Sequence, residues 1–229
     1  MNESNLSDLP PEMILQTLSH MKSSEIVEYC KINRHINTIC KLNRNLISRY
    51  ALQNNYGFNN FPSKYDYSSI MSYMNKRFKD NNQINYKEML KSVIKDHRMD
   101  VLRFLVVNGV KDYEDAVNYA VVYDNYDAFV YFIEDLGFDI TKATEDAEFY
   151  FNDLCIIAFT NPYVYQKPEI LEYIIKNYRQ HFTQDFLESV YYLLLEGGSV
   201  PLADYVQLIM DSDSLELPTV SHFLETYMD

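Results

Sequence analysis

Apolar residues recur with the period of a helix along the second half of the chain. Four six-residue blocks, each preceded by an acidic residue, are apolar at their first, second, fifth and sixth positions: VLRFLV (101–106), AFVYFI (128–133), ILEYII (170–175) and YVQLIM (205–210). This i, i+1, i+4, i+5 stripe is typical of a helix that packs on its neighbours. The blocks therefore predict four amphipathic helices of one repeated kind.

A second helical segment precedes each block, and the apolar pairs of these segments coincide when they are aligned. The segments are YKEMLKSVIK (86–95), YEDAVNYAVV (113–122), FNDLCIIAFT (151–160) and TQDFLESVYY (183–192). Thr183 suits an N-cap, and Glu114 with Asp115 suits the positive end of a helix. The pattern predicts a helical hairpin repeated four times, with residues 218–228 as a helix that closes the array.

Residues 86–215 resemble the helical half of ankyrin repeats. The similarity is clearest over MLKSVIKDHRMDVLRFLVVNG (89–109), and Gly109 and Gly137 keep the glycine that follows the second helix of that family. His97 occupies a turn where the family often has glycine, and the family's TPLH tetrapeptide is missing from every unit. The resemblance implies an ankyrin-like α-solenoid, which binds partners over an extended surface. An unrelated array of helical pairs is the alternative.

The beginning of the chain carries three shorter helical patterns. Pro10 and Pro11 suit a helix start, and a helix is expected to follow them to about His20. Its residues 13–15 are all apolar and span about 200° of the circumference, wider than the arc of about 100° that one packed face needs. We therefore expect one side of this helix to meet something else. Two more short helices are expected over residues 23–32 and 33–43.

The order Leu-Pro-x-Glu-x-Ile-Leu-x-x-Leu, followed by SSEIVEYCKINRHINTIC, resembles the F-box over residues 6–42. The F-box docks a substrate receptor onto the Skp adaptor of a cullin-RING ubiquitin ligase. Ile36 stands where that family usually has tryptophan. A plain bundle that caps the repeat array is the alternative. The adaptor-binding residues that the resemblance implies are Leu9, Pro10, Glu12, Ile14, Leu15, Leu18, Ile26 and Ile36.

Together these patterns predict an all-α protein of three parts. Residues 1–53 form an F-box-like N-terminal module of three helices, residues 54–85 a connector with one bridging helix over 69–78, and residues 86–229 the ankyrin-like array with its capping helix. The stretch NNYGFNNFPSKYDY (54–67) is broken by Gly57 and Pro62, which indicates a linker or an ordered connector.

Charge is distributed unevenly. Residues 1–111 hold 16 Lys and Arg against 10 Asp and Glu, whereas residues 112–229 hold 4 against 23. Such an acidic second half repels phosphates, so nucleic acid and anionic membranes are excluded as its partners, and a basic target protein suits it better. The apolar runs are also far shorter than the roughly 20 residues that span a bilayer.

The three cysteines are an odd number, and no secretion signal is visible, so we expect a reducing compartment. That compartment is the cytoplasm or nucleus, of a host cell if the source is a virus. Cys30, His35 and Cys40 match the last three ligands of a zinc knuckle. Five-residue steps along one helix would point these side chains apart, so we expect buried cysteines, a surface histidine and no metal.

Sequence motifs for catalysis or for phosphate and dinucleotide binding are absent, and the five histidines lie in separate segments. We therefore expect a protein that is not an enzyme and needs no cofactor. The expected function is that of a substrate-recognition adaptor: the F-box docks a Skp-family adaptor and its cullin complex, and the acidic array binds an unidentified target. The alternative is a protein-binding scaffold or decoy that recruits no ligase.

Overall fold

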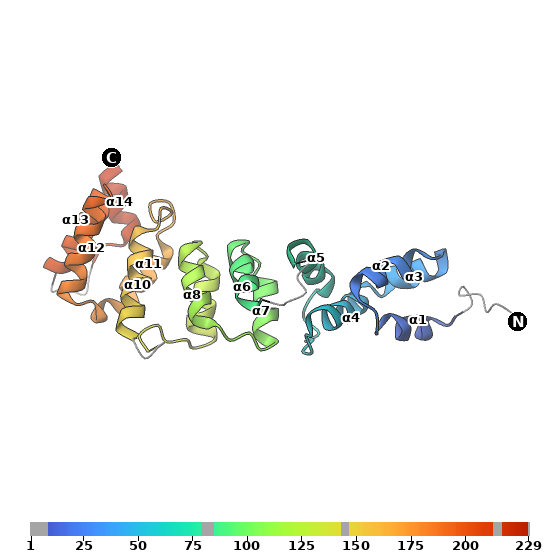
Figure 1. The fold of residues 1–229 in the computed structure, drawn as a ribbon. Helices are drawn as coiled ribbons and strands as arrows, with labels where there is room; N and C mark the ends of the chain where they lie inside the picture. Colours follow the sequence, from blue (N-terminus) through green and yellow to red (C-terminus); the bar gives the residue numbers. More distant parts are fainter. Residues whose placement is uncertain (1–8, 79–84, 143–146, 213–216, 229) are drawn as a thin grey trace, which may run out of the picture. The chain divides into compact units, whose positions relative to one another are not determined.

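A computed structural model describes residues 9–78, 85–142, 147–212 and 217–228, and every regular element within these ranges is helical (Figure 1). The expectation of an all-α protein is confirmed. The chain forms two compact units, Met1–Met89 with Asp100–Lys111 and Leu90–Met99 with Asp112–Asp229. The boundaries predicted at 53/54 and 85/86 stay predictions.

The first unit begins with three short helices and continues with two longer ones. Helix α1 packs on α3 and α4, α2 packs on the same two helices, and α4 packs on α5. The core between them is made of fully or almost fully buried aliphatic side chains, among them Ile14, Ile36 and Leu52. The bounds are α1 (Pro11–Leu18), α2 (Ser23–Lys31), α3 (Arg34–Leu42), α4 (Arg44–Tyr56) and α5 (Tyr67–Phe78).

The segment between α4 and α5 packs closely against the rest of the first unit. The rings of Phe58, Phe61 and Tyr65 lie 5.0, 5.9 and 6.1 Å from the ring of Phe104. The side-chain oxygen of Asn108 accepts hydrogen bonds from the backbone nitrogens of residues 59 and 60, at 3.1 and 2.9 Å. Buried aromatic packing and these hydrogen bonds make the segment an ordered connector rather than a free linker.

The helices of the predicted repeats form where the apolar stripes placed them. Helices α6 (Tyr86–Lys95) and α7 (Met99–Val107) contribute residues to both units, and the remaining helices belong to the second. No helix in the described ranges is long and apolar enough to cross a membrane. The second unit contains α8 (Tyr113–Val122), α9 (Tyr126–Val130), the π-helix η2 (Tyr131–Asp135), α10 (Ala147–Thr160), α11 (Glu169–Tyr178), the 3₁₀ helix η3 (Arg179–His181), α12 (Gln184–Glu196), α13 (Val200–Asp211) and α14 (Val220–Met228).

Within the second unit, helices pack on their partners in sequence, and at least one helix of each pair also packs on a neighbouring pair or on α14. Helix α10 packs on α8, α11 and α12, α12 packs on α13, and α13 packs on α14. Thr183 is the N-cap of α12, as expected, because its side chain accepts a hydrogen bond from the backbone nitrogen of Phe186 at 3.2 Å. These contacts bury the apolar stripes seen in the sequence.

One turn geometry connects the two helices of several pairs. His97, Asp124 and Gly198 have φ of 51°, 52° and 75°. The nitrogen of the next residue donates to the carbonyl five positions earlier: Arg98 to Val93 at 3.0 Å, Asn125 to Ala120 at 2.8 Å and Ser199 to Leu194 at 2.8 Å. This left-handed helix ending is the Schellman type. His97 is thus a turn residue, as the sequence indicated.

Candidate protein-docking surface of the N-terminal module

Helix α1 is held against the rest of the module at its buried face and at its end. Ile14 and Leu18 are fully buried. The side-chain nitrogen of Asn54 donates to the carbonyls of Ser19 and Met21, at 3.0 and 2.8 Å, and thereby fixes the turn after α1 to the end of α4. The position of α1 is therefore fixed before any partner binds to its outer side.

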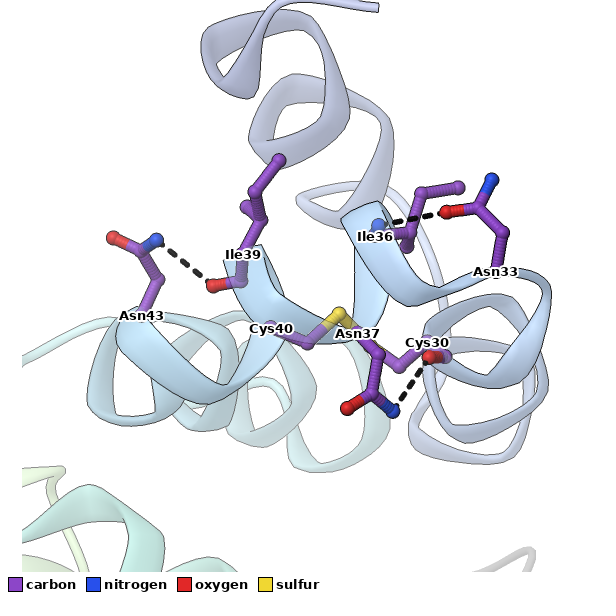
Figure 2. The surroundings of a disulfide bond; sticks show 7 residues. All are labelled: Cys30, Asn33, Ile36, Asn37, Ile39, Cys40 and Asn43. Atoms are coloured by element: carbon purple, nitrogen blue, oxygen red, sulfur yellow. Dashed lines mark hydrogen bonds between the residues drawn. A yellow bond between two sulfur atoms is a disulfide. The ribbon is translucent and has the colours of Figure 1, made fainter. Parts of the chain in front are cut away.

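A disulfide joins α2 to α3. Cys30 and Cys40 are bonded, with their Cα atoms 6.0 Å apart (Figure 2). Beside the bond, the side-chain nitrogen of Asn37 donates to the carbonyl of Cys30 at 3.1 Å, and Asn33 caps α3 by accepting from the backbone nitrogen of Ile36 at 2.9 Å (Figure 2). The turn between the two helices is closed by covalent and polar contacts together.

The expectation that Cys30 and Cys40 point apart is wrong, because the two are bonded; Cys40 is buried, as expected, and Cys30 is half-buried. Five-residue steps point side chains apart only within one helix, but α2 ends at Lys31 and α3 starts at Arg34, in agreement with the two helices expected here, so the chain folds back between the two sulfurs. His35 is exposed, as expected. Because disulfides persist mainly in oxidising environments, the cysteines no longer support the expected reducing compartment.

The residues expected to bind the adaptor fall into two groups. Ile14, Leu18, Ile26 and Ile36 are at most 5% exposed and form the interior of the module. They cannot touch a partner while the bundle stays folded, so the expectation that they contact the adaptor is corrected. Their role is that of core residues, which hold the surface residues of the module in place. Leu9 and Leu15 are half-buried, whereas Pro10 and Glu12 are exposed.

Other apolar residues of the module reach solvent. Met13 is 51% exposed on α1, and Leu42 is 80% exposed at the end of α3. Val27 and Ile32 are also exposed, at 50% and 52%. The wide apolar arc at residues 13–15 indicated that an apolar side chain of this helix, such as Met13, would be exposed. The sequence pattern of α3 does not indicate that Leu42 would be exposed.

Two of the surface positions lie along the same side of α3. Leu42 follows His35 by seven residues, which places both side chains on one stripe of the helix. The Nε2 atom of His35 lies 3.4 Å from the carbonyl oxygen of Leu9, just before α1. We call the exposed and half-buried residues Leu9, Pro10, Met13, Leu15 and Leu42 the docking surface.

Two features of the described residues concern metal binding and thiol reactivity. No group of three or more His, Cys, Asp or Glu side chains in the described ranges is placed to hold a metal ion. Burial raises the pKa of the Cys155 thiol far above its ordinary value, which keeps that thiol protonated and a poor nucleophile.

Comparisons with known proteins give no relative: no protein-family model matches the chain, and no curated protein or solved structure is significantly similar to it.

Proposed function

We propose that the protein is a non-catalytic adaptor of a ubiquitin ligase. Its N-terminal module docks the Skp-family adaptor of a cullin complex, and the helical pairs of its second unit hold a target protein. The observation that carries the proposal is the docking surface: Met13 and Leu42 are more than half exposed on a module whose helices are fixed by a packed core.

Exposed apolar residues on a rigid body are a basis for binding. Protein interfaces bury about 800 Å² on each partner, and most of their free energy comes from a few large side chains near the centre. Because Asn54 and the buried face of α1 already fix that helix, little conformational entropy is lost when it binds. The F-box and ankyrin-like architectures are part of the proposal and rest on the sequence resemblance.

The proposal implies the cytoplasm or nucleus, where this ligase machinery acts. A reducing environment does not sustain most disulfides. The buried core of the module, rather than the Cys30–Cys40 bond, must then be sufficient to shape the docking surface. We therefore expect docking to survive reduction of the protein.

Binding of the purified full chain to a purified complex of a Skp-family adaptor and a cullin, in reducing buffer, tests the proposal. We expect a stable complex, weakened more than about tenfold by Met13→Asp combined with Leu42→Asp. Phe149→Asp is the matched control because this residue is 70% exposed on α10, in the second unit. Leu18→Asp is unsuitable, since Leu18 is fully buried and the change would unfold the module.

Absence of binding by the unaltered chain would overturn the ligase proposal, as would an equal loss in the Phe149→Asp control. That outcome would favour the second candidate, a scaffold or decoy that binds its partner through the helical pairs and recruits no ligase. One observation supports this candidate: four of the eight residues that resemble F-box contacts are interior.

A further inference from the structure

The second unit contains an open groove of about 850 Å³. Helix α11 contributes more of its lining residues than any other element, and the rest come from α9, η2, η3, α13 and the segment leading into α14. Figure 1 shows α11 between α8 and the group α12–α14. The volume lies within the range of sites that enclose a ligand or a few residues of a peptide.

One face of α11 points into the groove. Glu169, Glu172, Tyr173 and Lys176 line it, and their spacing of three, four and seven residues places them on a single side of the helix. Ile175 on the same helix is almost fully buried and belongs to the apolar base of the groove. The groove therefore offers carboxylates and an aromatic ring above an apolar base.

Tyrosine rings make up part of the wall. Tyr126 is 39% exposed at the start of α9, and its ring centroid lies 6.4 Å from that of Tyr173, with the planes at 69°. Tyr173 packs edge-on against Phe129 at 5.5 Å, which holds its ring in place. Aromatic faces of this kind attract guanidinium and ammonium groups.

Two of the carboxylates are fixed by hydrogen bonds. The Oε1 atom of Glu134 accepts from the hydroxyl of Tyr173 at 3.0 Å. The Oε1 atom of Glu172 accepts from the backbone nitrogen and the hydroxyl of Ser221, at 2.8 and 2.6 Å. Each carboxylate keeps a second oxygen beyond these contacts, so the groove holds anionic acceptors whose positions are set before a ligand arrives.

The electrostatics of the groove have a negative bias. Burial, and after it the hydrogen bond to Glu134, raises the pKa of Tyr173. Burial and the charge of Glu172 raise the pKa of Tyr205 to about 12, against the opposing effect of Arg179. Both phenols therefore stay neutral at physiological pH.

The two basic residues of the groove do not reverse this bias. Arg179 donates from Nη2 to the carbonyl of Ile209 at 3.2 Å and also to that of Ser212, at the end of α13. Lys176 is exposed, one turn after Glu172. The residues of the second unit hold 7 Lys and Arg against 24 Asp and Glu, a net charge of −17.

We propose that this groove is the target-binding site of the protein and that it takes a short extended segment rich in arginine. The proposal rests on the adaptor function and names the chemistry of the target. An arginine side chain suits the groove because its planar guanidinium stacks on a tyrosine face and donates paired hydrogen bonds to a carboxylate. Acidic segments and phosphorylated ones are repelled.

The test measures binding of the full chain to a short fluorescein-labelled peptide in which arginine alternates with glycine. The comparison peptide replaces each arginine with citrulline, which has nearly the same shape and no charge. Fluorescence polarisation at physiological salt is expected to show binding of the arginine peptide, and binding of the citrulline peptide weaker by at least about tenfold.

Two double variants separate the groove from general attraction to an acidic protein. Tyr126→Ala with Glu134→Gln removes one ring and one charge from the groove. Tyr192→Ala with Glu188→Gln removes the same groups from the exposed surface of α12, where Tyr192 is 63% exposed. We expect the groove variant to lose at least about tenfold in affinity for the arginine peptide and the α12 variant to lose less than about twofold.

An equal loss in both variants would overturn the proposal and leave only non-specific charge attraction. Equal binding of the citrulline peptide, or no binding of either peptide, would overturn it as well. Adaptor binding of the groove variant is measured in parallel and is expected to match that of the unaltered chain. If the arginine peptide does not bind as expected while the unaltered chain binds the adaptor, only the assignment of the groove is overturned. If the unaltered chain does not bind the adaptor, only the ligase function is overturned.

Discussion

Asn125 is a polar side chain in the core of the second unit, 1% exposed. Its Nδ2 atom donates to the carbonyl of Ile94 at 2.7 Å, and its Oδ1 atom accepts from the backbone nitrogen of Ala128 at 3.0 Å. One amide thus caps α9 and satisfies a carbonyl near the end of α6. A buried amide with both of its ends paired specifies how two helices meet.

We expect Asn125→Ala to lower the free energy of unfolding by about 1–3 kcal/mol, because it removes the N-cap of α9 and a buried hydrogen bond to the carbonyl of Ile94, which keeps its bond from the backbone nitrogen of His97 at 3.1 Å. Chemical denaturation followed by circular dichroism measures the change. Asn177→Ala serves as the control: its side chain is exposed, so we expect a loss below about 0.5 kcal/mol. Equal losses in the two variants would show that burial of Asn125 does not matter.

The bond between Cys30 and Cys40 closes a short loop, with a sequence separation of 10. A loop of this length is expected to stabilise the folded chain by about 2–3 kcal/mol through its effect on the unfolded state. Replacing both cysteines by serine, or adding a reductant, should lower the free energy of unfolding of the first unit by that amount. The reductant should have no further effect on the double variant. Three free thiols in the unreduced, unfolded protein would contradict the assignment.

At the scale of the elements, the same left-handed turn ends several helices, but different residue types occupy its left-handed position. Gly198 adopts positive φ without steric penalty, whereas His97 and Asp124 adopt it with a Cβ atom present. At Asp124, burial and the neighbouring Glu169 also raise the pKa of the carboxyl group, with Lys167 and His97 opposing the effect. The backbone conformation of Asp124 and the charge of its carboxyl group therefore both lower the stability of the folded state.

We expect Asp124→Gly to stabilise the second unit by about 1 kcal/mol, because glycine removes the penalty of the left-handed conformation. A raised carboxyl pKa means that the folded state binds the proton more tightly, so the charge lowers stability as pH rises above the ordinary value of 3.8. The gain should accordingly be larger at pH 7 than at pH 3. Thermal unfolding at the two pH values measures it.

Asp124→Asn is the control for this change, since it removes the charge and keeps a side chain at positive φ. Its gain should be smaller than that of glycine and should fall in the same way toward low pH. A glycine variant less stable than the natural chain would show that the Asp124 side chain has a structural role that its geometry does not reveal.

The helices themselves could be predicted from the sequence because their apolar stripes are regular. The expected segment 113–122 coincides with α8. The π-helix at Tyr131–Asp135 could not be predicted, since its apolar residues keep the spacing of an ordinary helix. The break at residues 32–33 was expected, but the way the two helices pack across it was not, so the disulfide between Cys30 and Cys40 was missed.

At the scale of the whole molecule, the two candidate binding regions use different chemistry. The N-terminal module offers apolar side chains such as Met13 and Leu42, whereas the groove of the second unit offers fixed carboxylates beside tyrosine rings. The uneven distribution of charged residues along the sequence already indicated this difference between the two parts of the chain. The sequence could not show which residues of each amphipathic helix stay exposed, because neighbouring helices decide that, as Ile14 and Met13 illustrate.

The central claim is that the N-terminal module docks a ligase adaptor through its outer surface. Hydroxyl-radical footprinting of the full chain, alone and with the Skp-family adaptor bound, tests it most directly by reporting the accessibility of single side chains. The account predicts that oxidation of Met13 and Leu42 falls several-fold in the complex, while that of Phe149, 70% exposed in the second unit, does not change. Unchanged oxidation of Met13 and Leu42 in a complex that forms would contradict it.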